Sequence, residues 1–343
     1  MTSPHDGLTG LVARAGASLD WRTRPVRQRL RLAADLVAAR VGSADVALFH
    51  EFAPPPGGGG HQFLRGLVGE LERRGLRVER NRLSSGTPCG LLNSFNFELG
   101  RLRAFAHPGA RLVHRVDGPV GVYRGVDDGT DAWIARVNRE LAQATVFQSL
   151  YSLERHRELG FEFVDPVVIH NAPDPAIFHP SGRVPFDSDR RVRVVATSWS
   201  DNPRKGAPVL KRIEELLDPA VYELTFVGRS AVRFERFRAL DPLPPGQLAA
   251  LLRAHDVFLT ASLDEACSNA LLEALACGLP TVYVRSGSNG ELVGEAGFGF
   301  DEAEEVPALL DRLREEYAER QSLIEVPNLT EVADRYLEVL HGA

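Results

Sequence analysis

The 343-residue chain is short of lysine, cysteine and long apolar runs. Lys205 and Lys211 are its only lysines, so 38 of its 40 basic residues are arginine. The three cysteines, Cys89, Cys267 and Cys277, are odd in number and lack metal-ligand spacing, which predicts small buried side chains in a reducing cytoplasm. Because no apolar signal-peptide core and no uninterrupted apolar run of about 18 residues occurs, we expect neither secretion by a standard signal nor a membrane-spanning helix.

The composition is that of a soluble globular protein, with 44% hydrophobic and 25% charged residues. The formal net charge of −6 argues against a general nucleic-acid binder. An anionic ligand must therefore be held by local basic groups and not by the overall charge. The length suits two domains of about 150–180 residues.

The clearest pattern lies between residues 256 and 291. A short apolar run at its start predicts a buried strand. Ser268 or Asn269 can cap the helix that follows, and a Gly-Leu-Pro triplet at 278–280 ends it before a second strand and a tight loop. We expect a strand–helix–strand unit of a parallel sheet, with ligand-binding loops at the carboxyl ends of its strands.

Two glutamates stand in this unit with seven residues between them. Glu265 lies in the loop before the helix, and Glu273 lies within it among small or apolar neighbours, where a carboxylate is costly without partners. A carboxylate accepts two hydroxyl hydrogen bonds at once, as a vicinal diol of a ribose or hexose offers. The helix N-terminus at Ser268 and Asn269 offers free N–H groups suited to a phosphate.

The full string, Glu265-x7-Glu273 ending in Ala-Cys-Gly-Leu-Pro, resembles the donor-site signature of retaining GT-B glycosyltransferases of family 4. The resemblance implies that Glu265 contacts hydroxyls of the transferred sugar and that Glu273 holds the nucleotide ribose. It also implies an α/β fold of two facing Rossmann-like domains, with parallel sheets and an interdomain cleft.

On that basis we expect an N-terminal acceptor-binding domain over residues 1–172 and a proline-rich linker over residues 173–190. The donor domain would follow over residues 191–343. In the resembled fold the last helix crosses back onto the first domain, and residues 329–340 are suited to do so.

The N-terminal extension, residues 1–43, contains a predicted amphipathic helix from Pro25 to Val41. Five arginines crowd the beginning of this helix: Arg22, Arg24, Arg27, Arg29 and Arg31. We favour a solvated arginine face on a helix packed against the first domain. Peripheral contact of a cytoplasmic protein with the anionic inner membrane face stays open.

A glycine run at 57–60 separates a predicted strand from a helix and exposes backbone N–H groups. It departs from the dinucleotide pattern G-x-G-x-x-G. It does match the glycine-rich loop that faces the nucleotide diphosphate in the resembled family, which makes Gly58 and Gly59 candidate donor contacts. Farther along we expect one helix over residues 91–106 and a strand over residues 111–116.

Polar residues gather at the carboxyl end of that strand, in the string His114-Arg115-Val116-Asp117. Such a position suits a site better than the middle of a helix. In the resembled family a histidine in about this place reaches the donor sugar, so we take His114 and Asp117 as candidate catalytic residues. A structural histidine stays an alternative for His114, and Arg124 in the next loop is either solvated or an acceptor contact.

The second domain opens with a loop that contains Ser200, Arg204 and Lys205 just before a helix. A lysine beside a helix N-terminus adds a point charge to the positive end of the helix dipole. Lys205 matches the family's phosphate-binding lysine, so we assign it to the donor diphosphate. The family's arginine five residues earlier is replaced by Ser200, which leaves Arg204 or Arg229 as sources of a second cation.

We therefore expect a retaining transferase that moves a sugar from a nucleotide-diphosphate sugar to a hydroxyl of a small-molecule, glycan or lipid-linked acceptor. No metal and no further cofactor is expected, and Asp187-x-Asp189 resembles a D-x-D metal motif but lies in the linker. The resemblance implies that the leaving diphosphate takes the acceptor's proton. Alternatives are a pseudo-glycosyltransferase or sugar-nucleotide epimerase, a phosphorylase and a non-catalytic sugar-nucleotide-binding subunit.

Overall fold

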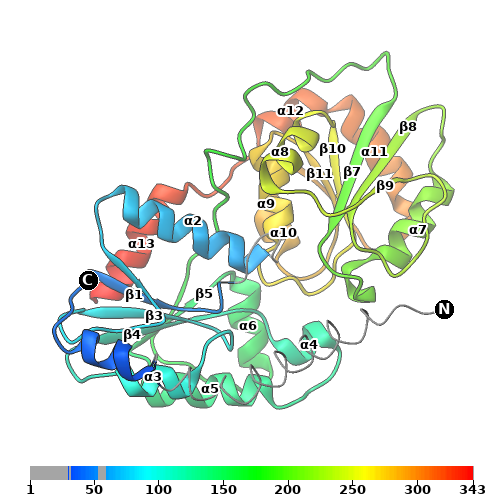
Figure 1. The fold of residues 1–343 in the computed structure, drawn as a ribbon. Coiled ribbons are helices and arrows are strands. Elements are labelled where there is room, and N and C mark those ends of the chain that lie inside the picture. Colours follow the sequence, from blue (N-terminus) through cyan, green and yellow to red (C-terminus); the bar gives the residue numbers. More distant parts are fainter. Residues whose placement is uncertain (1–29, 31, 53–58, 343) are drawn as a thin grey trace, which may run out of the picture.

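The computed structural model describes residues 30, 32–52 and 59–342, and in this part of the chain two six-stranded parallel sheets are present (Figure 1). The strand order is β2-β1-β3-β4-β5-β6 in the first sheet and β12-β11-β10-β7-β8-β9 in the second. This arrangement confirms the expected α/β class with two Rossmann-like halves. Gly58 and the five arginines of the N-terminal extension lie outside the described residues. The description resumes at Gly59.

Helices lie between most of the strands of the first sheet along the chain. Its elements are β1 (Val46–Phe49), α2 (Gly59–Arg73), β2 (Val78–Arg80), β3 (Cys89–Asn93), α3 (Leu99–Phe105), β4 (Arg111–Val116), α4 (Val120–Arg124), α5 (Thr130–Leu141), β5 (Ala144–Phe147), α6 (Leu150–Glu158) and β6 (Pro166–Val168).

The second sheet is built in the same way. Its elements are β7 (Val192–Ser198), the 3-10 turn η1 (Pro203–Lys205), α7 (Ala207–Leu216), β8 (Tyr222–Gly228), β9 (Arg238–Leu240), α8 (Pro245–Arg253), β10 (Val257–Thr260), α9 (Asn269–Ala276), β11 (Thr281–Val284), α10 (Asn289–Val293), β12 (Gly297–Phe300), η2 (Ala303–Glu305), α11 (Val306–Glu315) and α12 (Tyr317–Ser322).

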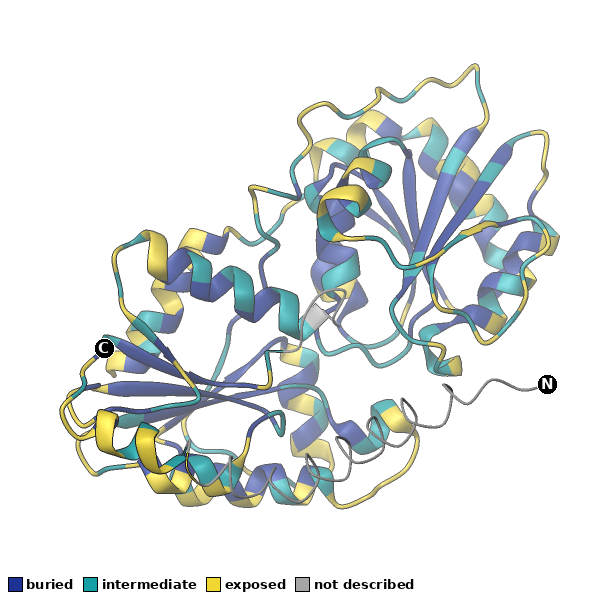
Figure 2. Ribbon diagram, viewed as in Figure 1, coloured by how far each residue is buried: buried dark blue, intermediate teal, exposed yellow. Residues whose placement is uncertain are grey.

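Each sheet is sandwiched by helices that turn an apolar face inward, and Figure 2 shows the buried strands between helices with exposed outer faces. The strands read as near-continuous apolar runs because both faces of a parallel sheet are covered. β1, for example, is buried at all four positions. The carboxyl ends of both sheets are thereby left as the places where polar side chains reach a cleft.

The last helix, α13 (Leu329–His341), packs on the first sheet and not on the second. Leu329, Val332, Tyr336 and Leu340 are buried in one cluster with residues of α2 such as Leu67. Figure 1 shows the red α13 beside the blue α2. The first hydrophobic core is therefore built from two distant parts of the chain.

One secondary-structure expectation is wrong: residues 91–106 do not form a single helix. Cys89–Asn93 is the strand β3, buried at every position and paired in parallel with both β1 and β4. Ser94, at φ +47°, ends the strand, and α3 begins only at Leu99. By its pattern alone, a five-residue apolar stretch can be a strand or part of a helix. Here it is a strand because it pairs with β1 on one side and with β4 on the other. Among the described helices, none is both long enough and apolar enough to cross a membrane.

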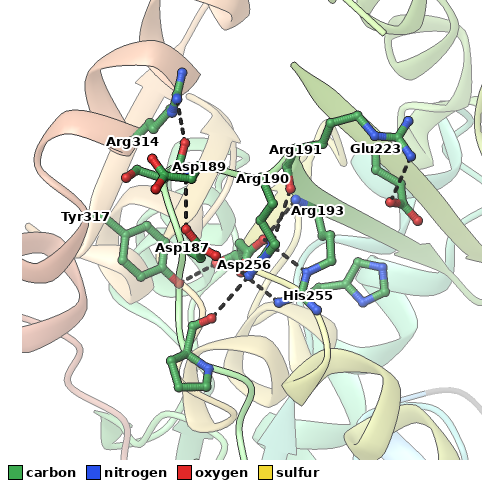
Figure 3. Close-up of polar contacts among 12 residues, drawn as sticks. Asp187, Asp189, Arg190, Arg191, Arg193, Glu223, His255, Asp256, Arg314 and Tyr317 are labelled. Carbon is green, nitrogen blue, oxygen red and sulfur yellow. Dashed lines mark hydrogen bonds and ion pairs between the residues drawn. The ribbon is translucent and has the colours of Figure 1, made fainter. Parts of the chain in front are cut away.

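The segment between the sheets is anchored to the second domain by a buried carboxylate (Figure 3). Arg190 donates to both oxygens of Asp256 at 2.6 and 2.7 Å, and Arg193 adds contacts at 3.0 and 3.1 Å. Burial alone would raise the pKa of Asp256, but the hydrogen bonds from the two arginines outweigh it and lower the pKa. Asp187, of the D-x-D string, accepts from the backbone N–H of Asp189 in an exposed turn.

Candidate functional site

A cavity of about 340 Å³ lies between the two domains, at the carboxyl ends of both sheets. The first domain contributes Phe95, Asp117, Gly118, Val120, Tyr123, Arg124 and Gln148 to its wall. The second contributes, among others, Trp199, Ser200, Lys205, Ser262, Asp264, Glu265, Ser268 and Asn269. The cavity therefore joins five of the predicted site residues: Asp117, Lys205, Glu265, Ser268 and Asn269.

Lys205 and Glu265 form an ion pair in this cavity, with 2.5 Å between Nζ and Oε1. Ser262 donates its hydroxyl to the same carboxylate oxygen, and the ammonium group lies 5.0 Å from the centre of the Tyr123 ring. Burial would lower the pKa of Lys205, but the charge of Glu265 outweighs it and the pKa is raised. A charged lysine thus stands beside a sugar-sized space, with a tyrosine of the other domain facing it.

The loop that carries Glu265 is held by the loop after β11. The N–H of Ser288 donates to the Glu265 carbonyl at 2.9 Å, and the N–H of Asp264 donates to Ser286 Oγ at 3.0 Å. Gly287, at φ +60°, lies so close that a Cβ built on it would be 2.5 Å from the Glu265 nitrogen. Only glycine allows this approach, so the loop fixes where Glu265 enters the cavity.

The N-terminus of α9 faces the same cavity. Ser268 is its N-cap, with Oγ accepting from the N–H of Leu271 at 3.4 Å. Ser268, Asn269 and Ala270 all line the cavity wall. The positive end of the helix dipole is therefore directed at the space beside Lys205, which favours an anionic group there.

Glu273 lies one turn farther along α9, in an adjoining hollow of about 120 Å³ that shares Trp199 and Asn269 with the main cavity. Burial raises the pKa of Glu273 to about 8. Its carboxylate has no hydrogen-bond or ionic partner among the described residues. A buried acid without protein partners suits a ligand that brings hydroxyl donors.

His114 requires a correction. It is fully buried, with Nε2 at 2.8 Å from the Ser94 carbonyl oxygen and Nδ1 at 3.4 Å from the Asn138 amide. Burial lowers the pKa of His114 to about 4. Side chains alternate along β4, and His114 points to the face covered by α5, so we withdraw its sugar-orienting role. Asp117, just beyond the end of the strand, is the residue of this string that reaches the cavity.

Neither candidate for the second cation lines the cavity. Arg204 forms an ion pair with Asp264, and the Arg229 guanidinium lies 4.9 Å from the centre of the Trp199 ring. Ser200 does line the cavity, where the family arginine would stand. Gly59 begins α2, and its neighbour Gly60 lines the cavity wall.

The sequence reasoning missed a set of contacts that join the domains. Glu291 of α10 accepts from the N–H groups of Leu150 and Tyr151 at the start of α6, at 2.8 and 3.2 Å. It also lies 2.6 Å from Nε2 of His170. Burial would raise the pKa of Glu291, but the hydrogen bonds from His170 and the two N–H groups outweigh it and lower the pKa. We call these four residues the interdomain latch.

A second contact ties the latch to the site. The Tyr151 hydroxyl donates to Asp264 at 2.9 Å, in the loop that carries Glu265. Asp264 also binds Arg204, so one carboxylate links the first domain to the loop that carries Lys205. Nothing in the local sequence around Tyr151 signals this, because the partner is 113 residues away.

Residues 192–318 match the family described as glycosyl transferases group 1, which gives the second half of the chain a domain of that kind. One curated relative, the D-inositol 3-phosphate glycosyltransferase of Corynebacterium glutamicum strain R, is 28% identical over 113 residues. That match covers 33% of this chain and 24% of the relative, so it spans about a quarter of the relative's length.

Solved glycosyltransferase structures resemble nearly the whole chain. Sucrose-phosphate synthase from Thermosynechococcus elongatus superposes with a TM-score of 0.69 at 16% identity, over 87% of this chain and 98% of that one. Anabaena HepE gives 0.66 at 16% identity, over 87% and 100%. WaaG, involved in lipopolysaccharide biosynthesis, gives 0.62 at 14% identity, over 87% and 100%. At these identities the likeness establishes the fold, which is GT-B.

Proposed function

We propose that this protein is a metal-independent, retaining glycosyltransferase that moves a sugar from a nucleotide-diphosphate sugar to an acceptor hydroxyl. The observation that carries the proposal is the Lys205–Glu265 pair at the N-terminus of α9, facing Asp117 across an interdomain cavity. A cation, a helix N-terminus and carboxylates then surround one space. Those are the groups that a diphosphate joined to a sugar requires.

In this proposal the donor lies along the start of α9. Lys205 and the N–H groups at Ser268 and Asn269 take the diphosphate, since both present positive charge to the cavity. Glu265 accepts hydroxyls of the transferred sugar, and Glu273 accepts those of the ribose in the adjoining hollow. The ion pair between Lys205 and Glu265 rearranges on binding, because the diphosphate is the stronger partner for the ammonium group.

The chemical step breaks the bond between the anomeric carbon and the diphosphate oxygen and forms a bond from that carbon to the acceptor oxygen on the same face. The acceptor's proton passes to the departing diphosphate, as the family resemblance implies. Lys205 and the α9 N-terminus stabilise the charge that develops on the leaving group. Asp117 and Gln148 of the first domain are in place to orient hydroxyls, and closure of the domains excludes water.

Relatives suggest which substrates to test first. HepE has been solved with UDP and glucose, and Staphylococcus aureus TarM with UDP and α-GlcNAc-glycerol. The Corynebacterium relative is named for inositol 3-phosphate. We propose a UDP-sugar donor and a polyol, glycan or lipid-linked acceptor, with peripheral membrane contact as one way to reach a lipid.

A non-catalytic sugar-nucleotide-binding subunit is the second candidate. It is favoured by Ser200 in the place of the family arginine, together with the engagement of Arg204 and Arg229 by Asp264 and Trp199. Such a protein would bind the donor without turnover. Calorimetry and product analysis therefore separate the two functions.

The deciding experiment incubates the protein with a panel of nucleotide-diphosphate sugars and acceptors, follows nucleotide release and assigns the product anomer by NMR. Lys205→Ala and Glu265→Gln should each lower turnover by about 100- to 1,000-fold while the fold is kept. Lys211→Ala, which removes the other lysine and lies outside the cavity lining, is the matched control and should leave turnover per folded protein unchanged. Equal turnover in Lys205→Ala and the wild type would refute the assignment.

A further inference from the structure

The largest fully buried side chain of the described residues is Arg115, in the strand β4. Its guanidinium donates from Nη1 to Asn93 Oδ1 at 2.6 Å and to Asp117 Oδ1 at 3.0 Å. Nη2 donates to Asn171 Oδ1 at 2.8 Å. A charge without access to water must be paired, so these contacts are a condition for its presence in the core.

Asp117 is held from two sides at one oxygen. Both Arg115 and Gln148 donate to Oδ1. No described residue donates a hydrogen bond to Oδ2, and the carboxylate side chain is 34% exposed at the cavity wall. One oxygen is therefore used to fix the group, and the other is left for hydroxyls in the cavity.

The same network crosses to the second domain. The side-chain oxygen of Asn171 accepts the hydrogen bond from Arg115. Its amide nitrogen donates to Gln148 Oε1 at 3.0 Å and to Asn269 Oδ1 at 3.2 Å. Asn269 is the first residue of α9. Asp117 is thus connected to the first residue of α9 by two hydrogen-bonded paths, one through Arg115 and one through Gln148, and the two paths meet at Asn171.

We propose that Arg115 is the positioning residue of the cleft: it fixes the Asp117 carboxylate in the cavity and, through Asn171, sets that carboxylate in register with the N-terminus of α9 in the opposite domain. The inference rests on the proposed function for its kinetic consequences. The position of the Asp117 carboxylate, in contrast, does not depend on turnover.

The arrangement explains why arginine stands there. A planar guanidinium can reach Asn93, Asp117 and Asn171 together, because its donors diverge in one plane. A lysine ammonium at the same depth reaches fewer of these oxygens, and each oxygen left without a donor inside the core costs stability. The Phe63 ring, 5.0 Å from the guanidinium carbon, closes the remaining side.

The test is a double-mutant cycle of Arg115→Lys and Asp117→Asn. Each single variant should lower kcat by about 100-fold, as a misplaced or neutral carboxylate does, while KM for the donor changes much less. If Arg115 acts through Asp117, Arg115→Lys in the Asp117→Asn background should cause no further loss of kcat. The melting temperature, in contrast, should fall in both backgrounds, by less beside Asp117→Asn because the ion pair with Arg115 is already lost there.

Losses of kcat that multiply in the double variant would overturn the inference, because they would show that Arg115 does not act through Asp117. Asn93→Ala provides a second cycle should Arg115→Lys fail to fold, since it frees the guanidinium on one side and keeps its charge. Asn93→Ala should likewise cause no further loss of kcat in the Asp117→Asn background.

A crystal structure of Arg115→Lys gives a readout that needs no turnover. Displacement of the Asp117 carboxylate from Gln148 supports the inference, and an unmoved carboxylate contradicts it. If the wild type transfers no sugar and the carboxylate still moves, the proposed function fails while the positioning role stands.

Discussion

Gly118 and Ala266 meet across the cleft so closely that a Cβ built on Gly118 would lie 3.0 Å from the Cβ of Ala266. Gly118 follows Asp117 in the first domain, and Ala266 follows Glu265 in the second. The two candidate carboxylates are therefore carried by neighbouring residues that touch from opposite sides. The two domains can approach this closely because Gly118 has no side chain.

We predict that Gly118→Val weakens transfer without unfolding either domain. The added methyl groups cannot fit beside Ala266, so the domains must separate and Asp117 moves away from Glu265. We expect kcat/KM to fall about 100-fold, since small misplacements at a reacting centre have effects of that size. Small-angle scattering should show a larger radius of gyration. Gly69→Ala, in the middle of α2 with nothing within 4 Å of the added Cβ, is the control and should leave kcat/KM unchanged.

Loss of the interdomain latch should also open the protein. Glu291→Ala removes the acceptor of two N–H groups and the partner of His170. Hydrogen bonds to a charged group contribute about 1.5–3 kcal/mol each, so the closed arrangement should lose a large part of its population. We expect weaker nucleotide-sugar binding by calorimetry. Glu295→Ala, an exposed acid near the same helix, should bind as the wild type does, and equal weakening in both would contradict the latch.

The latch should respond to acid. Because the folded pKa of Glu291 is below its ordinary value, its contribution is present above the unfolded pKa and is lost as pH falls through the lower folded pKa. Nucleotide affinity of the wild type should therefore weaken on acidification below about pH 4.5 more steeply than that of Glu291→Gln. Parallel pH curves for the two proteins would argue against this role.

The contribution of Glu273 to the stability of the fold should decrease as the pH rises, the opposite direction to that of Glu291. Its pKa is about 8 in the folded protein and 4.5 ordinarily, so between these values the folded state keeps a proton that the unfolded state has lost. The free energy of unfolding should fall as pH rises through that range, on the order of 5 kcal/mol in total. Thermal denaturation of Glu273→Gln should lack this slope.

Glu214 offers the matched control for that experiment. It is also buried, but Lys211 and three backbone N–H groups hold its pKa below the ordinary value despite the opposing effect of burial. Glu214→Gln should therefore lose stability at neutral pH, where Glu273→Gln gains it. Two variants that respond alike would mean that Glu273 has partners in solution.

Variants of His114 and Asp117 should affect different properties, the first mainly the unfolding free energy and the second mainly kcat. His114→Ala removes the ring that contacts the Ser94 carbonyl and takes from the Asn138 amide one of its two acceptors, so we expect a loss of about 2–4 kcal/mol in unfolding free energy. The folded fraction should keep its kcat. Asp117→Asn should lower kcat and, because it keeps an oxygen that can accept from Arg115 and Gln148, should cost less stability than His114→Ala; urea titrations beside turnover measurements compare the two.

The sequence was most informative where function and local structure coincide. The spacing of Glu265 and Glu273, the capping serine at 268 and the lysine before α7 all lie within single strand–loop–helix units, and the fold brings them to one edge of a sheet. These features could be read because a parallel sheet places successive loops side by side. The two-domain α/β architecture was predicted from the chain length and from the family resemblance.

What the sequence could not provide is the direction of individual side chains and the contacts between domains. His114 and Asp117 are three residues apart, yet one enters the core and the other the cavity, because the strand ends between them. Arg115 reads as a surface residue until its three acceptors are known. Glu291 finds its partners 121 to 141 residues away, and no local pattern reports such distances.

The placement of α13 bears on how the protein is made. The first sheet leaves the ribosome early, but Leu329, Tyr336 and Leu340, which cover one flank of it, are synthesised only after the whole second sheet. The half of the molecule that comes second in the chain is therefore the first able to complete its core. Until α13 has been synthesised, the earlier half keeps exposed the apolar surface that α13 later covers.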